Sequence, residues 1–211
     1  MGLQDLETYQ KIIQLFDSDD ETNVALACEL IKGCGMPPVI VQKLKSNLEG
    51  GLYFFANYGL VQHFAQSKAL DLSRLGLAVL PPAFATLSQL EHLNLAFNQL
   101  VELPETLEQL NQLKVLLLHY NKLATLPISL GAFRQLEELT LCFNRLTNLP
   151  ASIAQLNSLR VLHLHHNQLS QLPLELNSLP RLEKITLWGN AFSLENQALL
   201  SEVFDRVALV F

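Results

Sequence analysis

Leucines recur through the middle of the chain in a fixed order of apolar and polar positions. Four consecutive blocks between residues 90 and 181, of which "LKVLLLHYNKLATLPISLGAFRQ" is one, follow the pattern L-x-x-L-x-L-x-x-N-x-L-x-x-L-P without an insertion. In each block two leucines alternate with other residues, as Leu116 and Leu118 do, which predicts a short strand with one buried face. The Leu-Pro step and the apolar positions after it predict a 3₁₀ or short helical segment that closes each coil.

One asparagine follows each predicted strand, and the spacing between these asparagines is constant. They are Asn98, Asn121, Asn144, Asn167 and Asn190. We expect each amide to turn inward and to bond backbone groups of neighbouring coils as a ladder. Because one coil cannot bury its own leucines, the coils must stack. The pattern predicts a right-handed α/β solenoid with a parallel β-sheet on its concave face.

This repeat resembles the leucine-rich repeat, and the 23-residue period with the Leu-Pro step is similar to the Ras-group and bacterial intracellular members of that family. The resemblance covers residues 67–192, about six repeats. It implies a horseshoe-shaped scaffold for protein recognition and suggests a role in signalling. By analogy alone, it suggests a small GTPase as a partner.

The two ends of the chain depart from the repeat. Residues 1–66 contain helical spacings and capping signals, which predict a helical N-terminal capping domain. Residues 193–211 predict a C-terminal cap, in which 194–206 form an amphipathic capping helix. Its expected apolar positions are Leu194, Leu199, Leu200, Val203 and Phe204.

Charge and composition exclude several classes of partner. The net charge is −6, and the repeats from 67 to 192 carry nine acidic and nine basic residues, so no basic stripe exists for nucleic acid. The longest apolar runs are too short to cross a membrane. The first residues do not resemble a secretory signal, and three cysteines without a disulfide pattern favour a cytoplasmic protein.

The outward positions of the strands form columns in the stack, and the residue at each strand exit adds an aromatic row. Aromatic, charged and histidine side chains on one face are typical of protein-binding surfaces. We therefore predict a non-enzymatic interaction module that binds a protein or peptide and needs no cofactor. The predicted contact residues are His92, Asn94, Phe97, His119, Tyr120, Glu138, Thr140, Cys142, Phe143, Arg145, His163, His165, His166, Lys184 and Trp188.

Two other functions remain open at this stage. His119, Cys142, His163 and His165 offer zinc-type ligands or a Cys–His catalytic pair, although a flat sheet points them the same way and provides no pocket. We therefore expect neither catalytic nor metal-binding residues here. The third possibility is a structural or oligomerising module that uses the helical cap or the C-terminal "VALVF".

Overall fold

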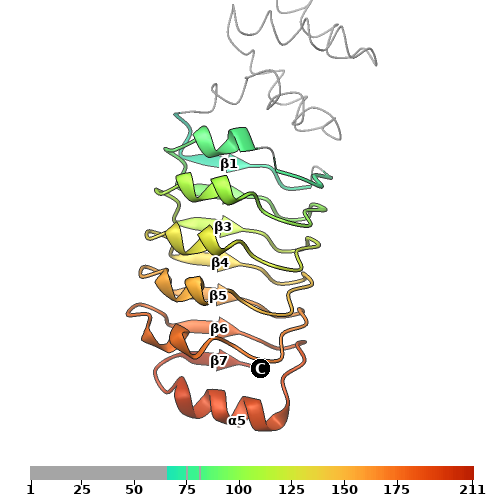
Figure 1. Ribbon diagram of the computed structural model, residues 1–211, viewed down its shortest axis with the longest axis vertical. Coiled ribbons are helices and arrows are strands. Elements are labelled where there is room, and N and C mark those ends of the chain that lie inside the picture. Colours follow the sequence, from blue (N-terminus) through green and yellow to red (C-terminus); the bar gives the residue numbers. More distant parts are fainter. Residues whose placement is uncertain (1–65, 75, 81) are drawn as a thin grey trace, which may run out of the picture.

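The described residues of the computed structural model, 66–74, 76–80 and 82–211, form one stack of coils with a parallel sheet along one side (Figure 1). The sheet has seven strands in chain order, each paired in parallel with the next. The helical cap predicted for residues 1–66 lies outside the described residues. The strands are β1 (Ala69–Asp71), β2 (His92–Asn94), β3 (Val115–Leu117), β4 (Glu138–Thr140), β5 (Val161–His163), β6 (Lys184–Thr186) and β7 (Ala208–Val210).

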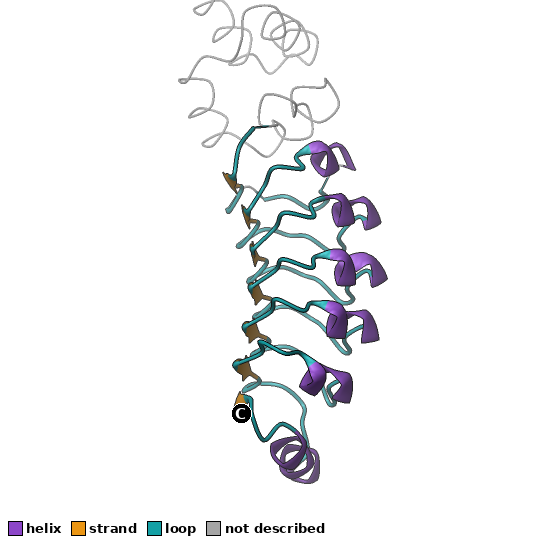
Figure 2. Ribbon diagram, turned by 90° about the vertical axis from the view of Figure 1, so that its left-hand side faces the viewer, coloured by secondary structure: helices purple, strands orange, loops and turns teal. Residues whose placement is uncertain are grey.

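Five short 3₁₀ segments run along the side opposite to the strands, and the strand side is gently concave (Figure 2). In the last four, a proline immediately precedes the first residue, where its missing N–H and fixed φ are tolerated. The prediction of a short helical turn after Leu-Pro is confirmed. These segments are η2 (Pro82–Thr86), η3 (Glu105–Gln109), η4 (Ile128–Ala132), η5 (Ala151–Gln155) and η6 (Leu174–Ser178).

Leucines from every described coil fill the space between the two layers. Leu118 and Leu141 are fully buried, as the strand pattern predicts. The register keeps equivalent residues beside each other, so Leu93 pairs with Leu116 and Leu116 with Leu139. One continuous apolar core therefore runs the length of the stack.

The asparagine ladder is confirmed in detail. The Asn144 side chain accepts a hydrogen bond from the Leu123 N–H at 3.0 Å and donates to the carbonyls of Leu118 and Leu141, both at 3.0 Å. The same three bonds recur at each of the other asparagines. Each amide thus joins its own coil to the preceding one at two points.

The C-terminal segment differs from the sequence prediction. The helix α5 (Leu194–Val203) is shorter than expected, and its apolar face is only partly used: Leu194 is 84% exposed and Leu199 50%, whereas Leu200 is buried. After it, the chain forms β7 beside β6, a strand that the sequence analysis missed. Strand pairing brings Leu209 against the core, and the backbone N–H of Leu187 bonds the Val210 carbonyl.

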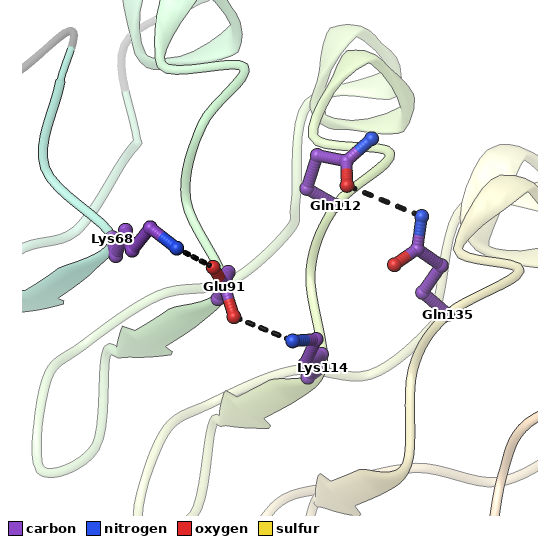
Figure 3. A network of polar contacts seen from close by, with 5 residues as sticks. All are labelled: Lys68, Glu91, Gln112, Lys114 and Gln135. Atoms are coloured by element: carbon purple, nitrogen blue, oxygen red, sulfur yellow. Dashed lines mark hydrogen bonds and ion pairs between the residues drawn. The ribbon is translucent and has the colours of Figure 1, made fainter.

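A column of alternating charge runs along the coils at the position just before each strand. Glu91 contacts Lys68 at 2.7 Å and Lys114 at 2.6 Å (Figure 3), and Arg160 contacts Glu183 at 2.9 Å. The bonds to Glu91 and Glu183 raise the pKa of Lys114 and of Arg160, respectively, and Glu137, which stands between these two cations, adds a smaller effect to both. The column, which we call the entry column, is Lys68, Glu91, Lys114, Glu137, Arg160 and Glu183.

The asparagine ladder predicts a specific loss of stability. Replacing Asn144 by Ala leaves the Leu123 N–H unpaired and removes one of the two bonds that the Leu118 and Leu141 carbonyls each accept from ladder asparagines. We therefore expect unfolding to be easier by about 2 kcal/mol. Asn144→Asp, which cannot donate, is expected to behave similarly. Denaturant unfolding measures both, with the exposed Asn148→Ala of the same coil as the control. An Asn144→Ala protein that is as stable as the Asn148→Ala control would contradict the ladder.

The entry column predicts that deleting one coil and deleting two coils have different effects on the salt dependence of the melting temperature. Removing residues 137–159 places Lys114 beside Arg160, whereas removing 114–159 places Glu91 beside Arg160. Raising NaCl from about 0.05 to 0.5 M screens exposed charges. Salt should therefore raise the melting temperature of the one-coil deletion and not that of the two-coil deletion. An equal response of both proteins would show that the column has no such role.

Candidate functional site

The residue that follows each described coil's strand by three positions adopts a left-handed backbone conformation. Its φ is between 53° and 60° at the non-glycine positions and 71° at Gly189. This turn lets the asparagine that follows point inward, and it directs the side chain of the positive-φ residue itself outward. We call this set the exit row: Arg74, Phe97, Tyr120, Phe143, His166 and Gly189.

The side chains of the exit row stack on one another. The Phe97 and Tyr120 rings are 4.6 Å apart and nearly parallel, and those of Tyr120 and Phe143 are 4.2 Å apart. His166 continues the row at 4.3 Å from Phe143. At the other end the Arg74 guanidinium lies over the Phe97 ring at 4.4 Å, a cation–π contact. The predicted aromatic row is therefore a single stack.

Gly189 ends the stack for a steric reason. A Cβ atom at this position would lie 2.6 Å from the Nδ1 of His166, so only glycine leaves room for that ring. The Trp188 ring stands edge-on to His166 at 4.3 Å and stacks on His165 at 4.6 Å. Trp188 thus connects the exit row to the outward face of the strands.

Three histidines on the strand face are anchored by threonines. His163 and His165 each place Nδ1 within 3.1 Å of the Thr186 hydroxyl, and His119 lies 3.2 Å from that of Thr140. The Thr186 hydroxyl has one proton, so it can donate a hydrogen bond to only one of the two imidazoles. The other must donate its own Nδ1–H. The two rings are therefore held in defined orientations.

Burial lowers the pKa of His119, His163 and His165. Other histidines add to the effect at His119 and His165, and Lys184 adds to it at His163, where Glu138 opposes it. These imidazoles are neutral at pH 7. The strand face is consequently less charged than its composition suggests.

Two of the predicted contact residues are not exposed. Thr140 and Cys142 are 7% and 8% exposed, so the expectation that every outward strand position reaches solvent is wrong. Their side chains are small and stand between larger neighbours in the columns, where His119 bonds the Thr140 hydroxyl. A partner on this face would meet the neighbouring rings before it met either side chain.

The remaining predicted contact residues lie in the strands or within five residues after them. Half-buried among them are Asn94, which accepts the Ala96 N–H at 3.0 Å, and Glu138. Exposed side chains are those of His92, Phe97, Tyr120, Arg145, Lys184 and Trp188. Phe143 and His166 are half-buried within the stack. The structure brings Phe97, Tyr120, Phe143, His166 and Trp188 together. His92 and Lys184 are the first residues of β2 and β6, at the opposite end of the strands from the exit row.

The chemistry of the strand face does not favour catalysis or metal binding. Among the described residues, no group of three His, Cys, Asp or Glu side chains is arranged to hold a metal ion. Burial raises the pKa of the Cys142 thiol, which keeps it protonated, whereas a nucleophilic cysteine needs a lowered pKa.

A comparison with protein families identifies the repeat. The model described as "Leucine rich repeat" matches residues 67–123 and 134–192, more than half of the chain. The chain belongs to the leucine-rich repeat family. Leucine-rich repeat domains are general protein–protein interaction modules, and proteins of the family are typically non-enzymatic.

Solved structures support the same fold. A leucine-rich repeat protein of Leptospira interrogans is 29% identical, with a TM-score of 0.57 over 71% of this chain. The match covers 45% of the Leptospira chain, so the present chain spans less than half the length of the Leptospira protein. No curated protein matches the chain. Within the described residues, none of the helices has the length and apolar character to cross a membrane.

The half-buried histidines His119, His163 and His165 predict a pH-dependent stability. Their pKa is lower in the folded chain than the ordinary 6.5, so the unfolded chain takes up protons first as the pH falls. Their contribution is complete above about pH 6.5 and decreases below it. Denaturant unfolding should therefore show lower stability at pH 5.5 than at pH 7.5. His163→Gln with His165→Gln should flatten this slope, whereas the exposed His92→Gln should not. An unchanged slope in the double variant would refute this assignment.

Proposed function

We propose that this protein is a non-enzymatic recognition module that binds a protein or peptide on its strand side, with the exit row and Trp188 as the main contact. The observation that supports it is the stack of partly exposed rings. Phe97 is 38% exposed, Tyr120 43% and Trp188 42%. Large aromatic side chains at the centre of an interface contribute a disproportionate share of the affinity.

The backbone of the exit row strengthens the proposal. A left-handed conformation costs a non-glycine residue about 1–2 kcal/mol, and glycine or asparagine adopts it most easily. The fold accepts glycine in this row, since Gly189 occupies it. The chain nevertheless places Phe97, Tyr120 and Phe143 there. Stacking between rings recovers about 0.5–1.5 kcal/mol per pair, and partner binding is a further reason to keep them exposed.

The same arrangement makes the surface rigid before it meets a partner. Each ring is held by its neighbours, His163 and His165 are anchored on Thr186, and the backbone beneath is tied by the asparagine ladder. Binding to such a surface immobilises few side chains, which lowers its entropic cost. The small GTPase suggested by family analogy is one partner to include in a binding panel.

An oligomerising role is the main alternative. β7 is the last strand of the described sheet, and Ala208 and Val210 on it are exposed. Self-association through this edge would appear as a concentration-dependent mass in light scattering. It would be weakened by Val210→Lys, which places a charge on the exposed edge and keeps the backbone pairing of β7 with β6, and it would be unaffected by changes in the exit row.

The proposal predicts that partner binding depends on two adjacent rings. Tyr120→Asn with Phe143→Asn removes them with a residue that tolerates positive φ, which offsets part of the lost stacking, and the melting temperature verifies that the protein is folded. Loss of about 2 kcal/mol or more at such residues corresponds to roughly a 30-fold weaker Kd. The measurement is quantitative affinity capture from lysate of the source cells, followed by titration of the captured protein.

The matched control is Val101→Asn with Ile128→Asn, which removes two exposed apolar side chains away from the strand face. It should capture the partner as the unchanged protein does. Capture that survives the exit-row variant, or that the control abolishes equally, would place the binding surface elsewhere.

A further inference from the structure

The exit side of the solenoid carries cations without any carboxylate. We consider three columns together: the second residue after each strand (Ser73, Ala96, His119, Cys142, His165 and Trp188), the exit row, and the residue two positions after the exit row. In six coils these columns contain Arg74, Lys122 and Arg145 and no Asp or Glu. We call these three columns the exit strip. The entry column on the other side of the strands alternates in charge and is neutral.

The three cations of the exit strip are not neutralised within the part of the chain that the structure describes. Arg74 lies over the Phe97 ring, and Lys122 bonds the side-chain oxygen of Gln99 at 2.9 Å, a neutral partner. Arg145 is exposed. Just outside the strip, Asp71 accepts the N–H of Ser73 at 2.9 Å. Positive potential therefore gathers along the exit strip although the whole chain carries a net charge of −6.

The ring stack adds to this potential. An aromatic ring is negative on its faces and positive at its edges. The faces of Tyr120 are covered by Phe97 and Phe143, at interplanar angles of 11° and 7°. The stack consequently turns ring edges outward. Edges and cations together are complementary to carboxylate oxygens, with apolar ring surface between them.

The same geometry disfavours a nucleic acid. Single-stranded nucleic acids bind by stacking bases on free aromatic faces along a continuous basic groove. Here the faces of the central rings are already occupied by their neighbours, and the strip holds three cations. An acidic segment of a protein needs neither a free ring face nor a continuous groove.

Spacing sets the length of such a segment. Neighbouring strands are about 4.8 Å apart, so three coil steps separate Arg74 from Arg145 by about 14 Å. An extended peptide advances about 3.3 Å per residue. Five or six residues running across the strands therefore reach all three cations.

We propose that the exit strip binds an extended acidic segment of a partner protein, five or six residues long by the spacing argument above. Its carboxylates pair with Arg74, Lys122 and Arg145, and its apolar side chains lie against the outward ring edges. The proposal rests on the proposed function and specifies the chemistry of the partner.

A synthetic pair of peptides tests it. The probe is an acetylated, amidated hexapeptide of alternating Glu and Phe, and its control has Gln in place of every Glu. Calorimetry measures binding. Trp188, the only tryptophan of the chain, contacts His166 at the end of the ring stack, so its fluorescence is a second measurement. We expect the acidic peptide to bind at least about tenfold more tightly than the Gln peptide, and added NaCl to weaken it.

Charge variants locate the site. Arg74→Gln with Lys122→Gln and Arg145→Gln should weaken the acidic peptide at least about tenfold. The control removes three cations elsewhere, as Arg134→Gln with Arg181→Gln and Arg206→Gln, and should bind the peptide as the unchanged protein does. Melting temperatures verify that both proteins are folded.

Several results would overturn the proposal. They are no binding of the acidic peptide, equal binding of the Gln peptide, equal effects of the two triple variants, or strip-dependent binding of oligothymidylate that is tighter than that of the peptide. If Tyr120→Asn with Phe143→Asn abolishes partner capture while the triple strip variant retains it, the proposed function stands and this inference fails. If the peptide binds the strip but the exit-row variant still captures the partner, the proposed function fails.

Discussion

One inward amide per coil determines the geometry of the whole solenoid. The Asn121 side chain accepts a hydrogen bond from the N–H of Leu100 and donates hydrogen bonds to the carbonyls of Leu95 and Leu118. These bonds fix both the distance between coils and the point at which each strand ends. To place the amide inside, the preceding residue must turn through positive φ, and its side chain is then directed outward. The exit row is thus a consequence of the asparagine ladder.

The repeat distance explains why the exit row can become a stack. Strands of a parallel sheet lie about 4.8 Å apart, and the observed ring separations along the row are 4.2 to 4.6 Å. Rings placed at the same position of successive coils therefore come into contact without any adjustment of the fold. The entry column exploits the same distance with opposite charges. The bonds to Lys114 and Lys68 lower the pKa of Glu91 to about 2, so this carboxylate keeps its ion pairs over the whole physiological range.

Those parts of the structure that repeat could be predicted from the sequence. The leucines, the prolines and the asparagines have the same environment in every coil, so one pattern describes them all. The exposure of Thr140 and Cys142 could not be predicted in this way, because it depends on the size of the side chains in adjacent coils. The positive φ of the exit row was missed because its residues, such as Phe97 and Tyr120, are not those that favour that conformation.

The end of the stack could not be predicted for a different reason. β7 has neither the leucine spacing nor the asparagine of a repeat, and only its position beside β6 makes Ala208–Val210 a strand. Amphipathic spacing in α5 suggested that Leu194 and Leu199 would be buried. Leu194 and Leu199 stay exposed, whereas the predicted Leu200, Val203 and Phe204 do meet the core and the chain beyond them adds Val207. A terminal segment has a neighbour on one side only, so its pattern constrains it less than that of an internal coil.

The difference between the two edges of the strands connects the fold to the proposed recognition. At the entry edge Glu91 and Glu183 pair with the cations of their neighbours, so little charge remains for a partner. At the exit edge the neighbours are the Phe97 ring and the Gln99 amide, which cannot neutralise Arg74 or Lys122. Both edges repeat once per coil. The residues of the entry column neutralise one another's charges, whereas the cations at the exit edge are available to an acidic partner. An acidic partner therefore has an electrostatic reason to approach from the exit side, where the side chains are already held in place.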